Sequence, residues 1–150
     1  MTTSNIPLPV YGEAPSDVHI TPRKAVYAII CCDNAIAVVR TPRGCFLPGG
    51  GVDPGETDEY ALVRELFEEL GWGVSITRCV DSAYQYHYSE AQQKYFLTLG
   101  TFYEAKYVAS ICEPVEDDHT LAWLTPEQAC EELRFEYMQQ AVKKCLKDAI

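Results

Sequence analysis

Residues 47 to 72 read LPGGGVDPGETDEYALVRELFEELGW, a glycine-rich turn followed at once by an acidic segment. Consecutive glycines let the backbone approach a ligand closely and turn its amides or carbonyls toward it. The segment after Gly55 is predicted to be a helix that ends at Gly71, since glycine is the preferred residue just beyond a helix end. Together, these features favour phosphate chemistry that depends on a metal ion.

The predicted helix carries three glutamates on one side. At about 100° per residue, Glu68 and Glu69 each lie within about 60° of Glu65. These acids repel one another, and the last helical turn favours cations instead. Violations of these two helix preferences are expected at functional sites. A hard divalent cation bound between the glutamates would replace their mutual repulsion by attraction to the ion. The alternative is a solvated acidic face. The neighbouring sector, expected to be buried, holds Leu62, Val63, Leu66, Phe67 and Leu70.

The spacing of the whole segment resembles the signature of the Nudix hydrolases. That signature is Gly, five residues, Glu, seven residues, Arg-Glu-aliphatic, one residue, Glu-Glu, one residue and Gly-aliphatic. The matching residues are Gly50, Glu56, Arg64, Glu65, Leu66, Glu68, Glu69 and Gly71, with Trp72 in place of the last aliphatic residue. The resemblance implies hydrolysis of a nucleoside diphosphate linked to another group, with Mg²⁺ or Mn²⁺ as cofactor.

The resemblance also implies roles for individual residues. Glu65 and Glu69 would be the main metal ligands, Glu68 a further ligand or the catalytic base, and the Gly49 carbonyl an additional ligand. Arg64 would act at the catalytic centre by forming an ion pair with Glu56 that holds the loop against the helix.

A second acidic segment, from Glu113 to His119, precedes Trp123. Many Nudix proteins bring a carboxylate from a loop in this region to the metals or to the attacking water. By that analogy Glu116 is the candidate catalytic residue, with Asp117 and His119 as alternatives. An acidic solvated turn explains the same residues equally well.

Substrate-binding candidates follow from residue type. Arg40 and Arg43 flank the turn before Pro48 and could reach phosphate oxygens, although ordinary surface charge is the alternative. Tyr88 belongs to a tyrosine cluster that could stack on a nucleobase. The alternation of Tyr84, Tyr86 and Tyr88 describes one face of a strand at least as well.

Composition limits the partners and the compartment. The formal charge of −10 over 150 residues argues against a nucleic acid polymer, which needs clustered Lys and Arg, and leaves a small nucleotide substrate. Seven cysteines without a Cys-x-x-Cys pair indicate thiols in a reducing compartment. Because no signal segment and no long apolar run is found, we expect a cytoplasmic protein without a membrane association.

Residues 1–22 contain four prolines and are predicted to form an irregular arm, which could pack on the domain or on a partner subunit and so leaves a homodimer open. Residues 23–150 are predicted to form one domain. Strands are expected over 24–32, 35–40, 74–88 and 95–108, with a turn at Asp33-Asn34, and a helix is expected to start at Pro126 and run with a break to Lys147. This order suggests an α/β/α sandwich with a mixed sheet, the fold that the Nudix resemblance also implies.

Three function classes remain. The first is a metal-dependent nucleotide pyrophosphohydrolase acting on nucleoside triphosphates or related diphosphates, with dinucleoside polyphosphates, ADP-ribose and sugar nucleotides as alternative substrates. The absence of proline at positions 87–89 weakens the ADP-ribose alternative. The second class is a non-catalytic nucleotide sensor, which the intact acidic set disfavours. The third is a prenyl diphosphate isomerase, for which no motif is found around the cysteines.

Overall fold

A computed structural model describes residues 7–115 and 118–148. The strands are β1 (Val10–Tyr11), β2 (Ile20–Ile29), β3 (Cys31–Cys32), β4 (Ala35–Thr41), β5 (Gly44–Phe46), β6 (Gly49–Gly51), β7 (Trp72–Ser89), β8 (Lys94–Ser110) and β9 (Thr120–Leu124). The helices are α1 (Asp58–Leu70), α2 (Pro126–Glu132) and α3 (Glu136–Asp148).

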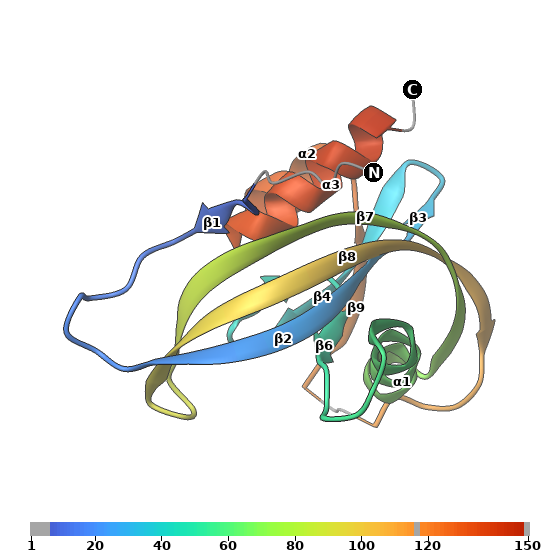
Figure 1. Cartoon of the computed structure of the whole chain (residues 1–150). Coiled ribbons are helices and arrows are strands. Elements are labelled where there is room, and N and C mark those ends of the chain that lie inside the picture. The colour runs from blue at the N-terminus through green and yellow to red at the C-terminus, as the bar shows by residue number, and fades with distance from the viewer. Residues whose placement is uncertain (1–6, 116–117, 149–150) are drawn as a thin grey trace, which may run out of the picture.

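The strands form two sheets. The larger sheet has the order β1-β7-β8-β2-β6, and it is mixed because β2 runs parallel to β8 and β1 runs parallel to β7. The smaller sheet contains β3, β4 and β5, with β9 antiparallel to β4. In Figure 1 the long β7 and β8 strands curve side by side across the molecule, with β2 along β8.

The strands at the centre are buried on both faces. Along β2, Val26 and Ala28 belong to the cluster that packs on α1, whereas Tyr27 and Ile29 belong to the cluster that packs on α2 and α3. Figure 1 shows α1 on one side of the strands and the two other helices on the opposite side. Strands buried on both faces read as continuous apolar runs, as the second half of β2 does. The predicted α/β/α sandwich with a mixed sheet is therefore confirmed.

Local signals located several turns and helix ends correctly. Asp33 and Asn34 both have positive φ, 50° and 62°. A two-residue hairpin turn of the common type requires this conformation at both central positions. Thr125 and Gln128 form the reciprocal capping box of α2, and the expected break separates α2 from α3.

The N-terminal segment is more regular than predicted. Ile20 to Pro22 already belong to β2, and β1 pairs with Tyr84 and Gln85 of β7. The tyrosine-rich stretch of β7 therefore has a neighbour on this side that periodicity could not reveal, because a two-residue strand carries no period. The domain boundary after residue 22 stays a prediction. Within the described ranges, no helix is long and apolar enough to cross a membrane.

Candidate functional site

The glycine turn is a strand pressed against β2. Gly49 to Gly51 form β6, which pairs antiparallel with Ala25 to Tyr27. A Cβ atom on Gly49 would collide with the carbonyl oxygen of Val26, and the φ of Gly49 is 145°. Only glycine fits this position, since a larger residue would meet backbone that cannot move aside. The glycines thus bring the loop backbone close to the core of the sheet and to α1.

Helix α1 has defined ends. The Thr57 side chain accepts a hydrogen bond from the Tyr60 backbone N–H at the N-terminus, and Gly71 ends the helix in the left-handed conformation. The backbone after β8 then wraps the helix end: the Ile111 N–H donates to the Gly71 carbonyl, and the Val115 N–H donates to the Glu68 carbonyl. The segment that leads toward His119 is therefore anchored on the acidic end of α1.

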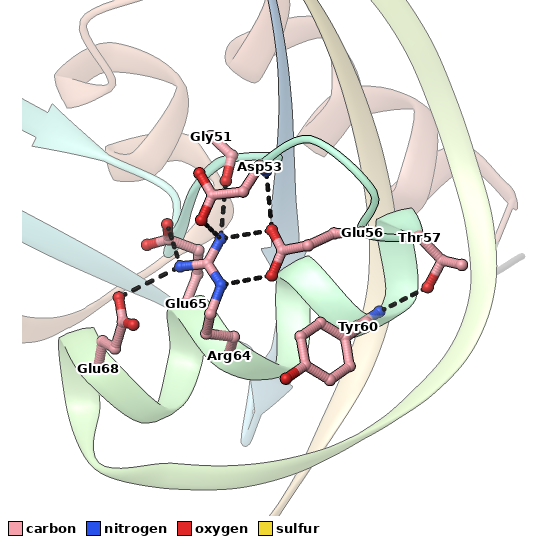
Figure 2. A network of polar contacts seen from close by, with 8 residues as sticks. All are labelled: Gly51, Asp53, Glu56, Thr57, Tyr60, Arg64, Glu65 and Glu68. Atoms are coloured by element: carbon pink, nitrogen blue, oxygen red, sulfur yellow. Dashed lines mark hydrogen bonds and ion pairs between the residues drawn. The ribbon is translucent and has the colours of Figure 1, made fainter.

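Arg64 lies at the centre of a polar network (Figure 2). Its guanidinium donates two hydrogen bonds to Glu56, with Nε to Oε2 at 2.7 Å and Nη2 to Oε1 at 2.8 Å. Nη2 also donates to the Gly51 carbonyl at 3.1 Å. The expected ion pair between Arg64 and Glu56 is thus present, and it ties the loop to the helix by a bidentate contact.

The same guanidinium also contacts two glutamates of α1, Glu65 and Glu68. Nη1 of Arg64 donates to Glu65 at 3.0 Å and to Glu68 at 3.3 Å (Figure 2). Arg64 and the Asp53 N–H, which both donate to the Glu56 carboxylate, lower the pKa of Glu56 to about 2. The carboxylates in turn raise the pKa of Arg64, with Glu56 as the largest contributor. The Arg64 and Glu56 charges are therefore maintained near neutral pH.

The acids do not lie where helical periodicity placed them. Glu69 is buried on the face of α1 that packs on the sheet, whereas Val63 and Phe67, expected to be buried, are exposed. The other buried residues of this face are Ala61, Leu62, Leu66 and Leu70. Compared with the face expected from the apolar residues, the buried face of α1 is therefore rotated toward the glutamates. Glu69 can be buried here because the glycine turn presents a backbone N–H group to this face of the helix. Glu69 Oε1 accepts a hydrogen bond from the Gly49 N–H at 3.0 Å.

Glu65 fills the space above the turn. A Cβ atom on Gly50 would lie 2.6 Å from the carboxyl carbon of Glu65. Because Gly50 has no side chain, the Glu65 carboxylate fits directly above its backbone, and this space is called the Gly50 cradle below. Glu65 and Glu69, one helical turn apart, both reach the glycine strand.

His119 also reaches the site. Its Nε2 atom lies 3.6 Å from Glu69 Oε2, and its Nδ1 atom lies 3.1 Å from Asp118 Oδ1. The candidates Glu116 and Asp117 lie outside the described residues. Of the acidic segment, the structure therefore places His119 beside the Glu69 carboxylate of α1.

The substrate-binding candidates separate into two groups. Arg43 and Tyr88 line one cavity of about 500 Å³, together with Arg23, His87, Phe96 and Arg134. Arg40 lies apart and makes a bidentate ion pair with Glu132 of α2, at 2.6 and 2.9 Å. This ion pair gives Arg40 a contact within the fold, so its predicted role toward the substrate stays a prediction.

The comparisons with known proteins agree with this geometry. The model of the NUDIX domain family matches residues 21–146. The chain belongs to the Nudix family. Several of its Nudix signature residues form the network around Arg64 in Figure 2. At the one departure from the Nudix signature, Trp72 is buried and packs on Tyr107 and Trp123, so it does serve as a packing residue.

Individual relatives match over shorter stretches. An ADP-ribose pyrophosphatase from Methanocaldococcus jannaschii is 46% identical over 59 residues, which cover 36% of this chain and 35% of that protein. A protein named putative 8-oxo-dGTP diphosphatase from Bacillus subtilis is 38% identical over 50 residues, which cover 33% of this chain and 34% of that protein. The matches thus span only about a third of these relatives.

The fold is shared more widely. The structure of a Nudix hydrolase from Nitrosomonas europaea superposes with a TM-score of 0.68 at 19% identity, covering 85% of this chain and 90% of that chain. At this identity the likeness concerns the fold alone.

The Nudix acids fit a hard divalent cation by two observations. Their donors are carboxylate oxygens, which Mg²⁺ and Mn²⁺ prefer, and Glu65 and Glu68 already converge on a cationic atom, Arg64 Nη1. The Gly50 cradle places Glu65 beside the loop backbone. Among the described residues, no three acids, histidines or cysteines form a complete metal-binding cluster. The assignment of Gly49, Glu65, Glu68 and Glu69 as ligands therefore stays a proposal.

Sequence reasoning missed Arg23 and Arg134 as candidates. Arg23 lies on β2, and its Nη2 atom comes within 3.4 Å of the position of a Cβ atom on Gly51. Arg134 follows α2 and donates from Nη1 to the Arg43 carbonyl at 2.9 Å. Arg23 and Arg134 are more than 100 positions apart in the chain, so no local spacing could have linked them.

Proposed function

We propose that this protein is a metal-dependent hydrolase of the diphosphate linkage in nucleoside triphosphates or related nucleoside diphosphate derivatives. The observation that carries the proposal is the complete acidic set of α1, which Arg64 and the backbone contacts hold against the glycine strand. The intact acidic set also disfavours a binding module without turnover. The names of the two relatives, which concern ADP-ribose and 8-oxo-dGTP, support a nucleotide substrate.

Glu65, Glu68, Glu69 and the Gly49 carbonyl would hold Mg²⁺ or Mn²⁺. When bound, such an ion neutralises phosphate charge and lowers the pKa of an attacking water. The acidity of the site makes the ion necessary for binding as well, because residues 56 to 69 contain six acids and one arginine, which would repel a bare polyphosphate. A small nucleotide as substrate, without a polymeric nucleic acid partner, belongs to the same proposal and is supported by the formal net charge of −10.

Two groups of the protein would act directly at the site, Arg64 and Glu68. Arg64 keeps the loop and the glutamates in register through its contacts to Glu56, Glu65 and Glu68. The Glu68 side chain is 39% exposed, and its Oε2 atom stays near Arg64. We propose Glu68, a further ligand or the base by the Nudix resemblance, as the group that accepts the proton of the attacking water, and its exposure supports this role. The water oxygen bonds to phosphorus as the bridging P–O bond breaks, and the bridging oxygen leaves with the departing phosphate.

His119 would support this step from the side. Its ring lies beside Glu69, so it can restrain that carboxylate, and Glu116 stays the proposed additional carboxylate of the same segment. We assign His119 a positioning role, since it contacts a proposed ligand and not the reacting atoms.

A substrate panel tests the proposal. Nucleoside triphosphates, oxidised purine nucleotides, diadenosine polyphosphates, ADP-ribose and a sugar nucleotide are assayed with Mg²⁺, with Mn²⁺, with Zn²⁺ and with excess chelator. We expect turnover with Mg²⁺ or Mn²⁺, less with Zn²⁺, which prefers nitrogen and sulfur ligands, and none with chelator. Hydrolysis that persists in chelator would overturn the metal dependence. No turnover of any panel member would favour the sensor.

A further inference from the structure

Three arginines gather at the cavity beside the end of β7. Arg23 comes from β2, Arg43 from the turn between β4 and β5, and Arg134 from the segment after α2. None of them forms an ion pair with a carboxylate in the part of the chain that the structure describes, although Glu90 also lines the cavity. In a chain with 22 acids and 12 bases, unpaired arginines on one cavity require an explanation.

The cavity walls hold these cations in place. Arg134 donates to the Arg43 carbonyl, and its guanidinium lies 5.2 Å from the ring centroid of Phe135. Arg23 stands against Gly51, where an added Cβ atom would lie 3.4 Å from its guanidinium. Two of the three side chains are thus positioned before a ligand arrives, which reduces the entropy lost on binding.

The cavity adjoins the glycine-rich loop through one shared residue, Arg23. Arg23 lines this cavity and also the neighbouring hollow formed by Gly51, Asp53 and Glu56. Arg23 therefore lies between the cavity and the loop that leads into α1. Tyr88, which is 42% exposed, adds an aromatic surface to the cavity wall.

The electrostatics of the cavity favour an anion. His87 lies at its wall with Nε2 at 2.9 Å from Thr98 Oγ1, and its ring stacks on Phe96. Burial, followed by the charges of Arg23 and Arg134, lowers the pKa of His87 to about 4. His87 is therefore neutral at pH 7, and the positive charge of the cavity comes from the arginines.

We propose that this cavity binds a phosphate group of the substrate that is separate from the diphosphate being cleaved. Each planar guanidinium group can donate two parallel hydrogen bonds to two oxygens of one phosphate. Several guanidinium groups together favour a doubly charged phosphate over an uncharged base. The phosphate site rests on the proposed hydrolase function and narrows its substrates to compounds that carry a terminal phosphate in addition to the diphosphate linkage that is cleaved.

Binding without turnover tests the site. In excess chelator, where the acids of α1 repel phosphate, the affinities of adenosine, AMP and ribose 5-phosphate are measured by calorimetry. We expect AMP and ribose 5-phosphate to bind at least about tenfold more tightly than adenosine, with an affinity that falls as salt rises. Equal affinity for adenosine and AMP would overturn the proposal and assign the cavity to the base.

Variants locate the bound phosphate. Arg23→Gln and Arg134→Gln should each weaken AMP binding by about tenfold or more, and Arg134→Lys should recover part of the loss, because it retains the charge without the planar fork. Arg78→Gln is the matched control, since Arg78 is engaged with Glu104 and Asp148. Circular dichroism checks that each variant folds. An AMP affinity that is the same in the parent, Arg23→Gln and Arg134→Gln would refute the site.

The two proposals fail separately. If a panel substrate is hydrolysed but the arginine variants bind AMP as tightly as the parent does, only the proposal of the phosphate site is overturned. AMP binding that depends on the arginines, without hydrolysis of any panel member, would leave the site standing and overturn the hydrolase.

Discussion

The carboxylate of Glu69 accepts a hydrogen bond from the backbone N–H of Gly49 at 3.0 Å, across 20 positions of sequence. An ionised side chain in an apolar core costs several kcal/mol unless polar groups surround it, so this burial requires the glycine strand and the neighbouring His119. The contact joins the end of α1 to the glycine loop. Substitutions at the glycines should therefore alter the positions of the glutamates, and substitutions at the glutamates should alter the loop.

Changing Glu69 to Gln removes the charge and keeps the shape. Turnover should fall at least about a hundredfold, because a proposed metal ligand is lost. Stability should stay within a few tenths of a kcal/mol of the parent, since the amide oxygen can still accept from Gly49 and repulsion from Glu65 is relieved. Steady-state kinetics and thermal unfolding measure both effects. Glu59→Gln, at an exposed position of the same helix, is the control, and near-parental turnover of Glu69→Gln would remove Glu69 from the metal site.

Alanine at two glycines should separate a close approach from an open turn. Gly49→Ala should destabilise by about 3 kcal/mol or more, because the new Cβ atom meets the Val26 carbonyl. The φ of Gly55 is 85°, but no atom lies within 4 Å of a Cβ atom added there. Gly55→Ala should therefore cost only about 1 kcal/mol, the strain of the left-handed backbone. Urea denaturation measures both values, and equal losses would contradict the close approach of Gly49 to β2.

Gly50→Ala should act on activity instead. The three atoms nearest to its Cβ atom would all belong to the end of the Glu65 side chain, which can move aside. We expect near-parental stability and a loss of turnover of about tenfold or more, since the carboxylate leaves its cradle. A fully active variant would show that the position of Glu65 above the glycine strand has no catalytic importance.

The Glu56 and Arg64 pair should shape acid denaturation. Because the folded pKa of Glu56, about 2, lies below its ordinary value of 4.5, the pair contributes stability above pH 4.5 and loses it as the pH falls toward 2. In Glu56→Gln this part of the pH dependence should disappear, together with the stability at pH 7. Urea midpoints between pH 2 and pH 7 measure it, with exposed Glu131→Gln as control. An unchanged profile would deny the pair a role in stability.

His87 should act in a different pH range. Its folded pKa of about 4 lies below the ordinary value of 6.5, so the unfolded chain binds the proton first and stability falls as the pH drops from 6.5 to 4. His87→Gln, which keeps a polar group near Thr98, should lower the slope of stability over this range, whereas exposed His19→Gln should leave it unchanged. Identical slopes for the parent and His87→Gln would show that the fold does not lower the pKa of His87.

Local chemistry made much of the fold predictable. The Asp33-Asn34 turn, the capping box at Thr125 and the Gly71 helix end depend on residues within a few positions of one another, and each lies where the sequence indicated. The short strand β1 was missed, since its partner in β7 lies more than 70 positions away. The orientation of α1 was also wrong by part of a turn, because the periodicity of apolar residues does not register that Glu69 could be buried against a backbone amide.

The sequence by itself identified the Nudix segment, and the resemblance to that family implied the pairing of Arg64 with Glu56 and the mixed α/β/α fold that the order of the elements also suggests. The segment could be recognised because its residues lie within one helix and its preceding loop, where geometry follows from about 3.6 residues per turn and from the conformational freedom of glycine. Only the tertiary structure decided that Glu69 is buried beside Gly49, that His119 joins it, and that Arg23, Arg43 and Arg134 share one cavity. These residues come from separate strands and loops, and the packing of two helix layers on the sheets, which no local rule encodes, is what brings them together.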